Sequence, residues 1–167
     1  MKAHIHSTVF LVISICIFGL IHSASATIYS DEKALQGVTK SRTLFDINLT
    51  EAPKLELYLS VIKQTQADLV RQGVTPEIVI AFRGASVRLI TSETWVFSEE
   101  EQKSLERSAG LLAELANAGI RIEACAIATN LFKVDNSTLL PGIEVVGNTF
   151  VSLTGYQTKG YTLIPIQ

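Results

Sequence analysis

Histidine and cysteine are scarce in this sequence of 167 residues. All histidines lie at or before His22, and the only cysteines are Cys16 and Cys125. From residue 23 onward, a Ser-His-Asp triad or a Cys-His pair cannot form within one chain. The same part of the chain excludes an imidazole metal site, and a thiolate zinc cluster there would need several chains.

Neither sign of charge dominates the sequence. Its 14 basic and 16 acidic residues give a formal net charge of −2, which offers no electrostatic reason to expect nucleic acid as a partner. Glycine-rich phosphate-binding loops and the nucleophile motifs of hydrolases are missing as well. A hydrolase, a metalloenzyme and a nucleotide-binding dehydrogenase are therefore disfavoured, and we expect neither a metal nor another cofactor.

Residues 1–26 have the pattern of a secretory signal peptide. Lys2 supplies a positive start, Val9–Ile21 is almost continuously apolar, and the small residues Ala24 and Ala26 follow. This pattern predicts cleavage after Ala26. The apolar run is shorter than the roughly 20 residues of a membrane-spanning helix, so an uncleaved anchor is the less favoured alternative. We expect a periplasmic or secreted protein with no membrane contact after cleavage.

Cleavage would leave Cys125 as the one thiol of the chain. Export leads to an oxidising compartment, but a single cysteine cannot form an internal disulfide. Cys125 is then free, joined to another molecule or kept in a reactive state, and it is the candidate catalytic residue.

The spacing of apolar residues predicts an α/β domain over residues 44–167, preceded by a flexible polar lead-in over residues 27–43. Strands that alternate with helices indicate a mainly parallel sheet with right-handed crossovers. The expected strands are 44–49, 77–82, 120–128, 143–147, 149–153 and 161–166, and the expected helices follow Thr50 and Ser98.

Local signals mark the ends of these two helices. Thr50 stands at an N-cap position, and Ser98 with Glu101 matches a capping box. Gly73 and Gly119 provide the C-terminal stops.

Cys125 lies near the end of an expected strand, where sites form in open parallel sheets. If residues 126–131 begin a helix, its N–H groups and dipole favour a thiolate. Strand alternation places Cys125 with Arg121 and Glu123 on the less apolar face. A buried cysteine often acts as a small hydrophobic residue, however, so a structural role stays open.

Four other residues are candidates for a ligand site or an interface. Arg83 and Arg88 flank the end of the second strand, where they could bind a small sulfur anion, stabilise a thiolate, or form surface or intersubunit ion pairs. Gln157 and Lys159 precede the last strand and could line a pocket or meet a neighbouring subunit. Trp95 is expected to pack or to anchor an interface.

Five segments in a fixed order resemble the DsrE family, in particular its exported single-domain members. They are LFDINLT, EIVIAFRGASVRLIT, GIRIEACAIATNLF, VDNSTLLPGIEVV and GYQTKGYTLIPI, which together extend from about residue 44 to residue 166. The most specific pieces are the I-x-x-C-A-x-A block around Cys125, the segment Val134–Gly142 and the Y-Q-x-K-G-Y ending.

The resemblance implies a three-layer α/β fold with a mainly parallel five-stranded sheet flanked by helices, assembled into a homo-oligomer such as a dimer, trimer or hexamer. In sulfur-relay members of the family, the cysteine that matches Cys125 accepts sulfane sulfur as a persulfide and passes it on. The resemblance thus implies a sulfur carrier, served by a donor or acceptor protein or a small sulfur anion, rather than a turnover enzyme. The characterised relays are mostly cytoplasmic, whereas this sequence has an export signal.

Two other functions stay open at this point. The chain could be an oligomeric ligand- or protein-binding module of the periplasm in which Cys125 is structural. It could also be a redox sensor in which mild oxidation of Cys125 changes an interaction.

Overall fold

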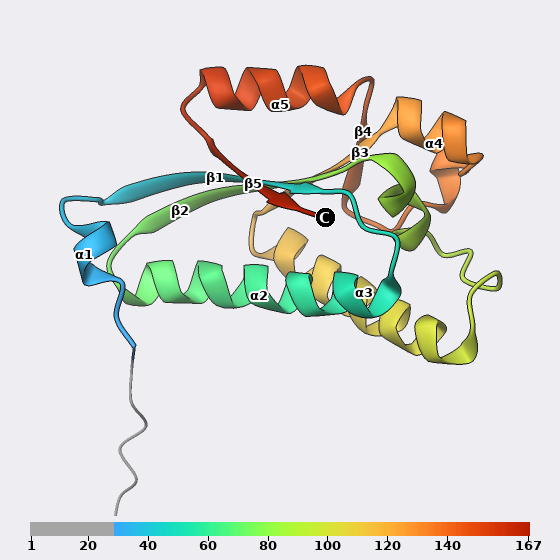
Figure 1. Ribbon diagram of the computed structural model, residues 1–167, viewed down its shortest axis with the longest axis horizontal. Coiled ribbons are helices and arrows are strands. Elements are labelled where there is room, and N and C mark those ends of the chain that lie inside the picture. The colour runs from blue at the N-terminus through green and yellow to red at the C-terminus, as the bar shows by residue number, and fades with distance from the viewer. Residues whose placement is uncertain (1–28) are drawn as a thin grey trace, which may run out of the picture.

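A parallel sheet of five strands lies at the centre of residues 29–167, the part of the chain that the computed structural model describes (Figure 1). The strand order is β4-β3-β2-β1-β5, and every neighbouring pair is parallel. This architecture confirms the predicted α/β fold class, whereas the predicted signal peptide lies outside the described residues. The strands are β1 (Lys40–Ile47), β2 (Thr75–Phe82), β3 (Arg121–Cys125), β4 (Ile143–Val146) and β5 (Thr162–Ile166). The helices are α1 (Glu32–Leu35), α2 (Ala52–Arg71), α3 (Glu99–Asn117), α4 (Ala126–Phe132) and α5 (Thr149–Thr158), with 3₁₀ turns η1 (Gly84–Leu89) and η2 (Asn136–Thr138).

Helices cover both faces of the sheet (Figure 1). Helices α2 and α3 pack on one face, while α5 lies on the other and α4 stands at the end of β3. Strands β1 and β2 end in runs of buried residues, which is typical of a parallel sheet between two helical layers. Burial of each large apolar side chain contributes about 1.5–3 kcal/mol. The larger core includes Phe45, Ile80, Phe82, Leu55 and Leu112, and the smaller core beneath α5 includes Leu44, Val79, Ala81 and Leu153.

The first strand begins earlier than expected. β1 starts at Lys40 rather than Leu44, and Arg42 stands opposite Glu77 of β2. Arg42 Nε lies 2.9 Å from Glu77 Oε2, and Lys40 Nζ lies 3.9 Å from Glu77 Oε1. These exposed charged side chains interrupt the apolar alternation, so the pattern in the sequence begins only at Leu44.

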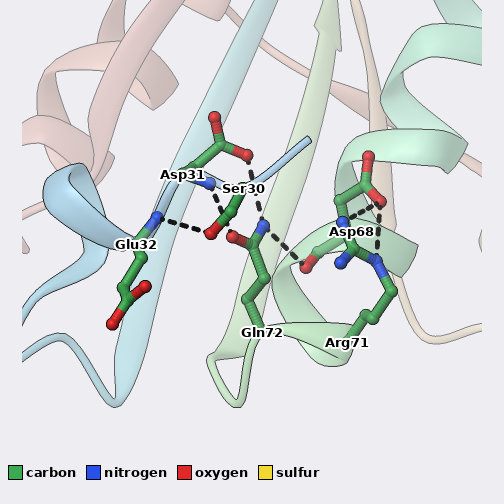
Figure 2. A network of polar contacts seen from close by, with 6 residues as sticks. All are labelled: Ser30, Asp31, Glu32, Asp68, Arg71 and Gln72. Atoms are coloured by element: carbon green, nitrogen blue, oxygen red, sulfur yellow. Dashed lines mark hydrogen bonds and ion pairs between the residues drawn. The ribbon is translucent and has the colours of Figure 1, made fainter. Parts of the chain in front are cut away.

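The residues before β1 are hydrogen-bonded to the end of α2 (Figure 2). The backbone N–H of Asp31 donates to Gln72 Oε1 over 2.8 Å, and Gln72 Nε2 donates to Asp31 Oδ2 over 3.2 Å. On the same turn of α2, Arg71 Nη2 donates to Asp68 Oδ1 over 3.0 Å. The flexible lead-in expected over residues 27–43 instead contains a short helix, α1, next to this network and the start of β1.

The strand expected over residues 149–153 is wrong. These residues form the first half of α5, whose N-cap Asn148 accepts a hydrogen bond from the N–H of Phe150 over 2.9 Å. Phe150 and Val151 are residue types that favour strands locally. Burial of Leu153 against the sheet outweighs that preference, because a short helix is stabilised mainly by packing of one face.

Most other strand boundaries differ from the expected ones by one or two residues, and two further differences lie at helix starts. Strand β3 ends at Cys125 and α4 begins at Ala126, so the strand expected over residues 120–128 is too long and the alternative of an early helix is confirmed. The N-cap of α2 is Glu51 rather than Thr50. A difference of one residue is common at helix ends, where hydrogen bonding is incomplete.

The predicted capping box at the start of α3 is confirmed. Ser98 Oγ accepts a hydrogen bond from the N–H of Glu101 over 3.4 Å, and Glu101 Oε2 accepts one from the N–H of Ser98 over 3.0 Å. Each residue thus satisfies a backbone donor of the other that the helix itself leaves unpaired.

Replacement of Ser98 by alanine tests the contribution of this cap. Ser98→Ala removes the acceptor of the Glu101 N–H, so we expect the free energy of unfolding, measured in urea, to fall by about 1 kcal/mol. Ser60→Ala is the matched control, because Ser60 is exposed in the middle of α2, where alanine favours the helix. An equal loss in both variants would contradict the predicted effect.

Candidate functional site

Cys125 stands at the carboxyl end of β3, where the chain turns into α4. Its residue surface is 6% exposed, and it pairs across the sheet with Val146 at the end of β4. Because all strands are parallel, their carboxyl ends meet at one edge of the sheet. The structure therefore places the cysteine at the edge where ligand sites form in folds of this class.

The thiol of Cys125 contacts the N-terminus of α5, which is distant in the sequence. The backbone N–H of Thr149, the first residue of α5, donates to Sγ over 3.4 Å. The side-chain hydroxyl of Thr149 is also buried, and it has no hydrogen-bond partner among residues 29–167. Unpaired N–H groups and the helix dipole favour negative charge at this position. The free hydroxyl is available as a further donor to a thiolate.

These surroundings lower the pKa of the Cys125 thiol. Burial raises that pKa, but the side chain and the N–H of Thr149, followed by the N–H groups of Ala128 and Ile127, together outweigh burial. The Thr149 hydroxyl acts here as a nearby dipole, because its geometry does not meet that of a hydrogen bond. Burial and hydrogen-bond donors alone determine this shift of the pKa, and no histidine contributes to it. This combination makes Cys125 a candidate nucleophile rather than only a small core residue.

Arg83 and Asp46 form an ion pair at the same edge of the sheet. Arg83 Nε and Nη2 lie 2.7 and 2.9 Å from the two carboxylate oxygens of Asp46. Asp46 is 5% exposed, and the guanidinium carbon of Arg83 lies 5.7 Å from the centre of the Phe150 ring. Arg83 therefore connects the ends of β1 and β2 to the first turn of α5.

A cavity of about 200 Å³ opens beside the sulfur of Cys125. Its lining includes Arg83 and Gly84 together with apolar side chains from α4 and α5. Gly84 has φ = 58°, and a Cβ at this position would displace the side chain of Asn48; glycine is therefore favoured where the chain leaves β2. At the rim, Leu131 and Phe150 are largely exposed to solvent.

A buried carboxylate holds α5 against β3. Glu123 is 2% exposed, and its oxygens accept hydrogen bonds from Ser152 and from the hydroxyl of Tyr156, the latter over 2.7 Å. Arg121 Nε lies 3.4 Å from Glu123 Oε1. Because Glu123 and Cys125 share one face of β3, these contacts fix the helix whose first N–H reaches the thiol.

The other predicted residues lie away from the Cys125 cavity. Arg88 packs over the ring of Phe97, 5.9 Å from its centre, and lines a different cavity together with Trp95. Lys159 follows the last turn of α5, where its Nζ lies 5.8 Å from the centre of the Tyr156 ring. Gln157 is exposed in the same turn. Of the four ligand or interface candidates, the structure brings only Arg83 to the cysteine.

Three residues of the site were missed in the sequence analysis. Asp46 is the one charged residue of the segment LFDINL, and a charge within a strand buried on both faces needs a partner, so a signal was present. Thr149 and Phe150 left no such signal, because their segment has the composition of a strand. Their role depends on where α5 starts.

Within residues 29–167, neither a metal site nor a membrane span is found. The structure places no group of three or more His, Cys, Asp or Glu side chains where they could hold a metal ion in this range. No helix in the same range combines the length and the apolar character needed to cross a bilayer.

Comparisons with known proteins agree with this architecture. A model of the DsrE/DsrF-like family matches residues 33–166. An uncharacterized protein of Aquifex aeolicus is 26% identical over 125 residues, which are 74% of this chain and 55% of that protein. The chain therefore spans about half the length of this relative.

Solved structures with the same fold come from three organisms. The protein of unknown function MTH1491 from Methanobacterium thermoautotrophicum has a TM-score of 0.60 and 23% identity, over 75% of this chain and 99% of its own. The ychN protein of E. coli has a TM-score of 0.51 and 13% identity, over 75% and 99%. The conserved protein of unknown function BT1422 from Bacteroides thetaiotaomicron has a TM-score of 0.51 and 22% identity, over 77% and 95%. At identities this low, the structural similarity shows a shared fold alone.

Removal of the Thr149 hydroxyl tests its effect on the thiol. Thr149→Val keeps the backbone N–H but removes the hydroxyl, so we expect the pKa of Cys125 to rise and alkylation by iodoacetamide near neutral pH to slow by about tenfold, the effect of one hydrogen bond to a charged group. The measurement is the alkylation rate as a function of pH. Thr154→Val is the matched control, because the Thr154 hydroxyl donates to the carbonyl of Phe150 and is exposed. An unchanged pH midpoint in Thr149→Val would contradict the assignment.

The buried cluster around Glu123 predicts a dependence of stability on pH. Burial, followed by the hydrogen bond to Glu123 and its charge, raises the pKa of Tyr156 from 10.0 to about 12. The folded chain therefore keeps this phenol protonated where the unfolded chain has lost the proton, and the resulting stability is complete below about pH 10 and is lost as the pH approaches 12. The measured quantity is the difference in the free energy of unfolding between the unmodified chain and Tyr156→Phe. We expect this difference to be larger at about pH 9 than at about pH 11.5. An equal difference at the two pH values would show that the cluster does not act in this way.

Proposed function

The chain belongs to the DsrE/DsrF-like family, and from this premise we propose that it is a carrier of sulfane sulfur, held by Cys125 as a persulfide. One observation carries the proposal: Cys125 Sγ accepts the N–H at the start of α5 and lies beside a cavity with an exposed rim. A carrier needs a thiolate that a donor can reach. The contacts of Cys125 support the thiolate, and the cavity supports access to it.

Loading of the carrier is a displacement between sulfur atoms. The Cys125 thiolate attacks the outer sulfur of a donor persulfide, R–S–SH, and a new S–S bond forms as the bond in the donor breaks. The electron pair leaves on R–S⁻, which takes a proton from water, and Cys125 then carries –S–SH. Sulfur is transferred without net oxidation, so the step needs neither an oxidant nor a general base once the thiol is ionised.

Burial of Cys125 supports a carrier role over general thiol reactivity. Oxidation of cysteine to sulfenic and sulfinic acids depends on thiolate character and on exposure. The residue is 6% exposed, so reagents reach the sulfur mainly through the cavity. Most of the side chains that line this cavity are apolar, and they suit an organic sulfur donor better than a strongly hydrated oxidant.

The proposal includes an exported homo-oligomer. The pattern of residues 1–26 supports a periplasmic or secreted location. Leu131, Phe150 and Val151 are exposed apolar side chains on α4 and α5, and such groups support contact with a second copy or with a sulfur donor or acceptor protein.

Mass measurement of the intact protein tests the proposed function. The mature chain is treated with an organic persulfide, R–S–SH, and we expect a gain of one sulfur, about 32 Da, on the wild-type chain and none on Cys125→Ser. A thiol acceptor added afterwards is expected to return the protein to its starting mass, because a carrier releases its sulfur.

Sulfinic acid is the main interference, since two oxygen atoms add almost the same mass as one sulfur. Dithiothreitol distinguishes the two, because it removes sulfane sulfur but does not reduce a sulfinic acid. The proposal fails if no gain labile to dithiothreitol is seen, or if the same gain occurs in Cys125→Ser. A sulfenic acid or a mixed disulfide in place of the persulfide would indicate a redox sensor.

A further inference from the structure

Arg83 is the one charged residue among those that line the described cavity beside Cys125. Two of its donors, Nε and Nη2, are occupied by the carboxylate of Asp46 at 2.7 and 2.9 Å. Asp46 is buried, so it has no alternative partner in solvent. The ion pair is neutral as a unit, because the carboxylate of Asp46 occupies the fork formed by Nε and Nη2. An anion could reach only the remaining Nη donors, whose positive charge Asp46 already offsets.

The remainder of the cavity wall is uncharged. Ile127, Leu131 and Phe150 contribute apolar side chains, and the N–H of Thr149 donates to the sulfur itself. The buried hydroxyl of Thr149, which has no partner among residues 29–167, is available to support a charge there, and Asn148, the other polar side chain of the wall, is uncharged. These groups suit a single negative charge, that of the thiolate. A second anion would meet repulsion in a poorly solvated space.

We infer that the cavity takes an uncharged organic polysulfane, R–S–S–S–R, as the sulfur donor in preference to a small anion such as thiosulfate. This inference rests on the proposed function and specifies its substrate class. The apolar groups R match the side chains of Leu131 and Phe150 at the rim, and the sulfur chain reaches Cys125 within the cavity.

The reaction balances without a further reactant. The Cys125 thiolate forms a bond with the central sulfur, and the bond between that sulfur and one outer sulfur breaks. The electron pair departs on R–S⁻, which takes up a proton from water, and Cys125 is left as the trisulfide Cys–S–S–S–R. A partner thiol can remove sulfane sulfur from this species by a displacement of the same type.

Two trisulfides that differ only in charge test the inference. Bis(2-carbamoylethyl) trisulfide is neutral, whereas bis(2-carboxyethyl) trisulfide is a dianion of the same length. The rate constant for modification of Cys125 by each is measured by mass spectrometry and divided by that for N-acetylcysteine amide, a neutral small thiol. The preference is the rate constant for the neutral reagent divided by that for the dianion. We expect this ratio to be about tenfold larger for the protein than for the small thiol, since the cavity brings like charges together only with the dianion.

Variants of the ion pair assign the preference to its cause. Asp46→Asn leaves the charge of Arg83 without its partner, so we expect the preference for the neutral reagent to fall several-fold. Arg83→Gln leaves Asp46 as an unpaired carboxylate and is expected to keep or increase the preference. Glu77→Gln is the matched control: Glu77 pairs with Arg42 at the opposite end of β1 and β2, and its loss is expected to leave the preference unchanged.

The outcomes separate this inference from the proposed function. A preference equal to that of the small thiol, or a preference for the dianion, overturns the inference and leaves the sulfur carrier standing. Failure of Cys125 to react with either trisulfide overturns the inference, and the sulfur carrier falls with it only if the persulfide, R–S–SH, also produces no gain in mass. An unchanged preference in Asp46→Asn also contradicts the inference, and if that variant does not fold, the wild-type ratio and Arg83→Gln decide.

Discussion

All strands of the described sheet run in the same direction, and the position of the site depends on this constraint. Asp46, Arg83 and Cys125 belong to three separate strand ends, yet parallel pairing brings all three to one edge. A helix that follows a parallel strand must also begin at that edge, because the chain has to return to the opposite edge before the next strand. Helix α5 follows β4 and precedes β5, so it begins at the edge where β3 and β4 end (Figure 1), and its first N–H donates to the thiol.

Two buried carboxylates give this edge its rigidity. Asp46 is satisfied by Arg83, and Glu123 by Tyr156, Ser152 and Arg121. Removal of one partner from a buried ion pair typically costs about 3–5 kcal/mol, so the first role of Arg83 is to neutralise Asp46. This requirement limits what Arg83 can offer to a ligand. Glu123 in turn holds α5 in the place where Thr149 meets Cys125.

Much of the fold could be predicted from the sequence, because apolar periodicity and helix caps are local signals. The alternation in LFDINL and the capping box at Ser98 both identify elements that the structure contains. Contacts between distant segments leave weaker signals. Thr149 follows the N-cap of a helix whose composition favours a strand, and only packing on the sheet reveals its contact with Cys125. Arg88 lies close to Arg83 in sequence, but the turn η1 directs it toward Phe97 instead.

The absence of histidine from the described residues changes what is required of Cys125. A lower thiol pKa increases the fraction of thiolate but reduces the nucleophilicity of each thiolate, so the best attacking thiol has a pKa near the ambient pH. At Cys125, burial acts against the donors of α4 and α5 and moderates their effect on the pKa. The same donors assist the reverse process, because a thiolate of lower pKa is also the better leaving group when sulfur passes to an acceptor. In the proposed carrier, the same backbone and hydroxyl donors therefore assist both loading and release. A strong base beside the cysteine would help to ionise the thiol before loading, but it would not help the thiolate to leave on release.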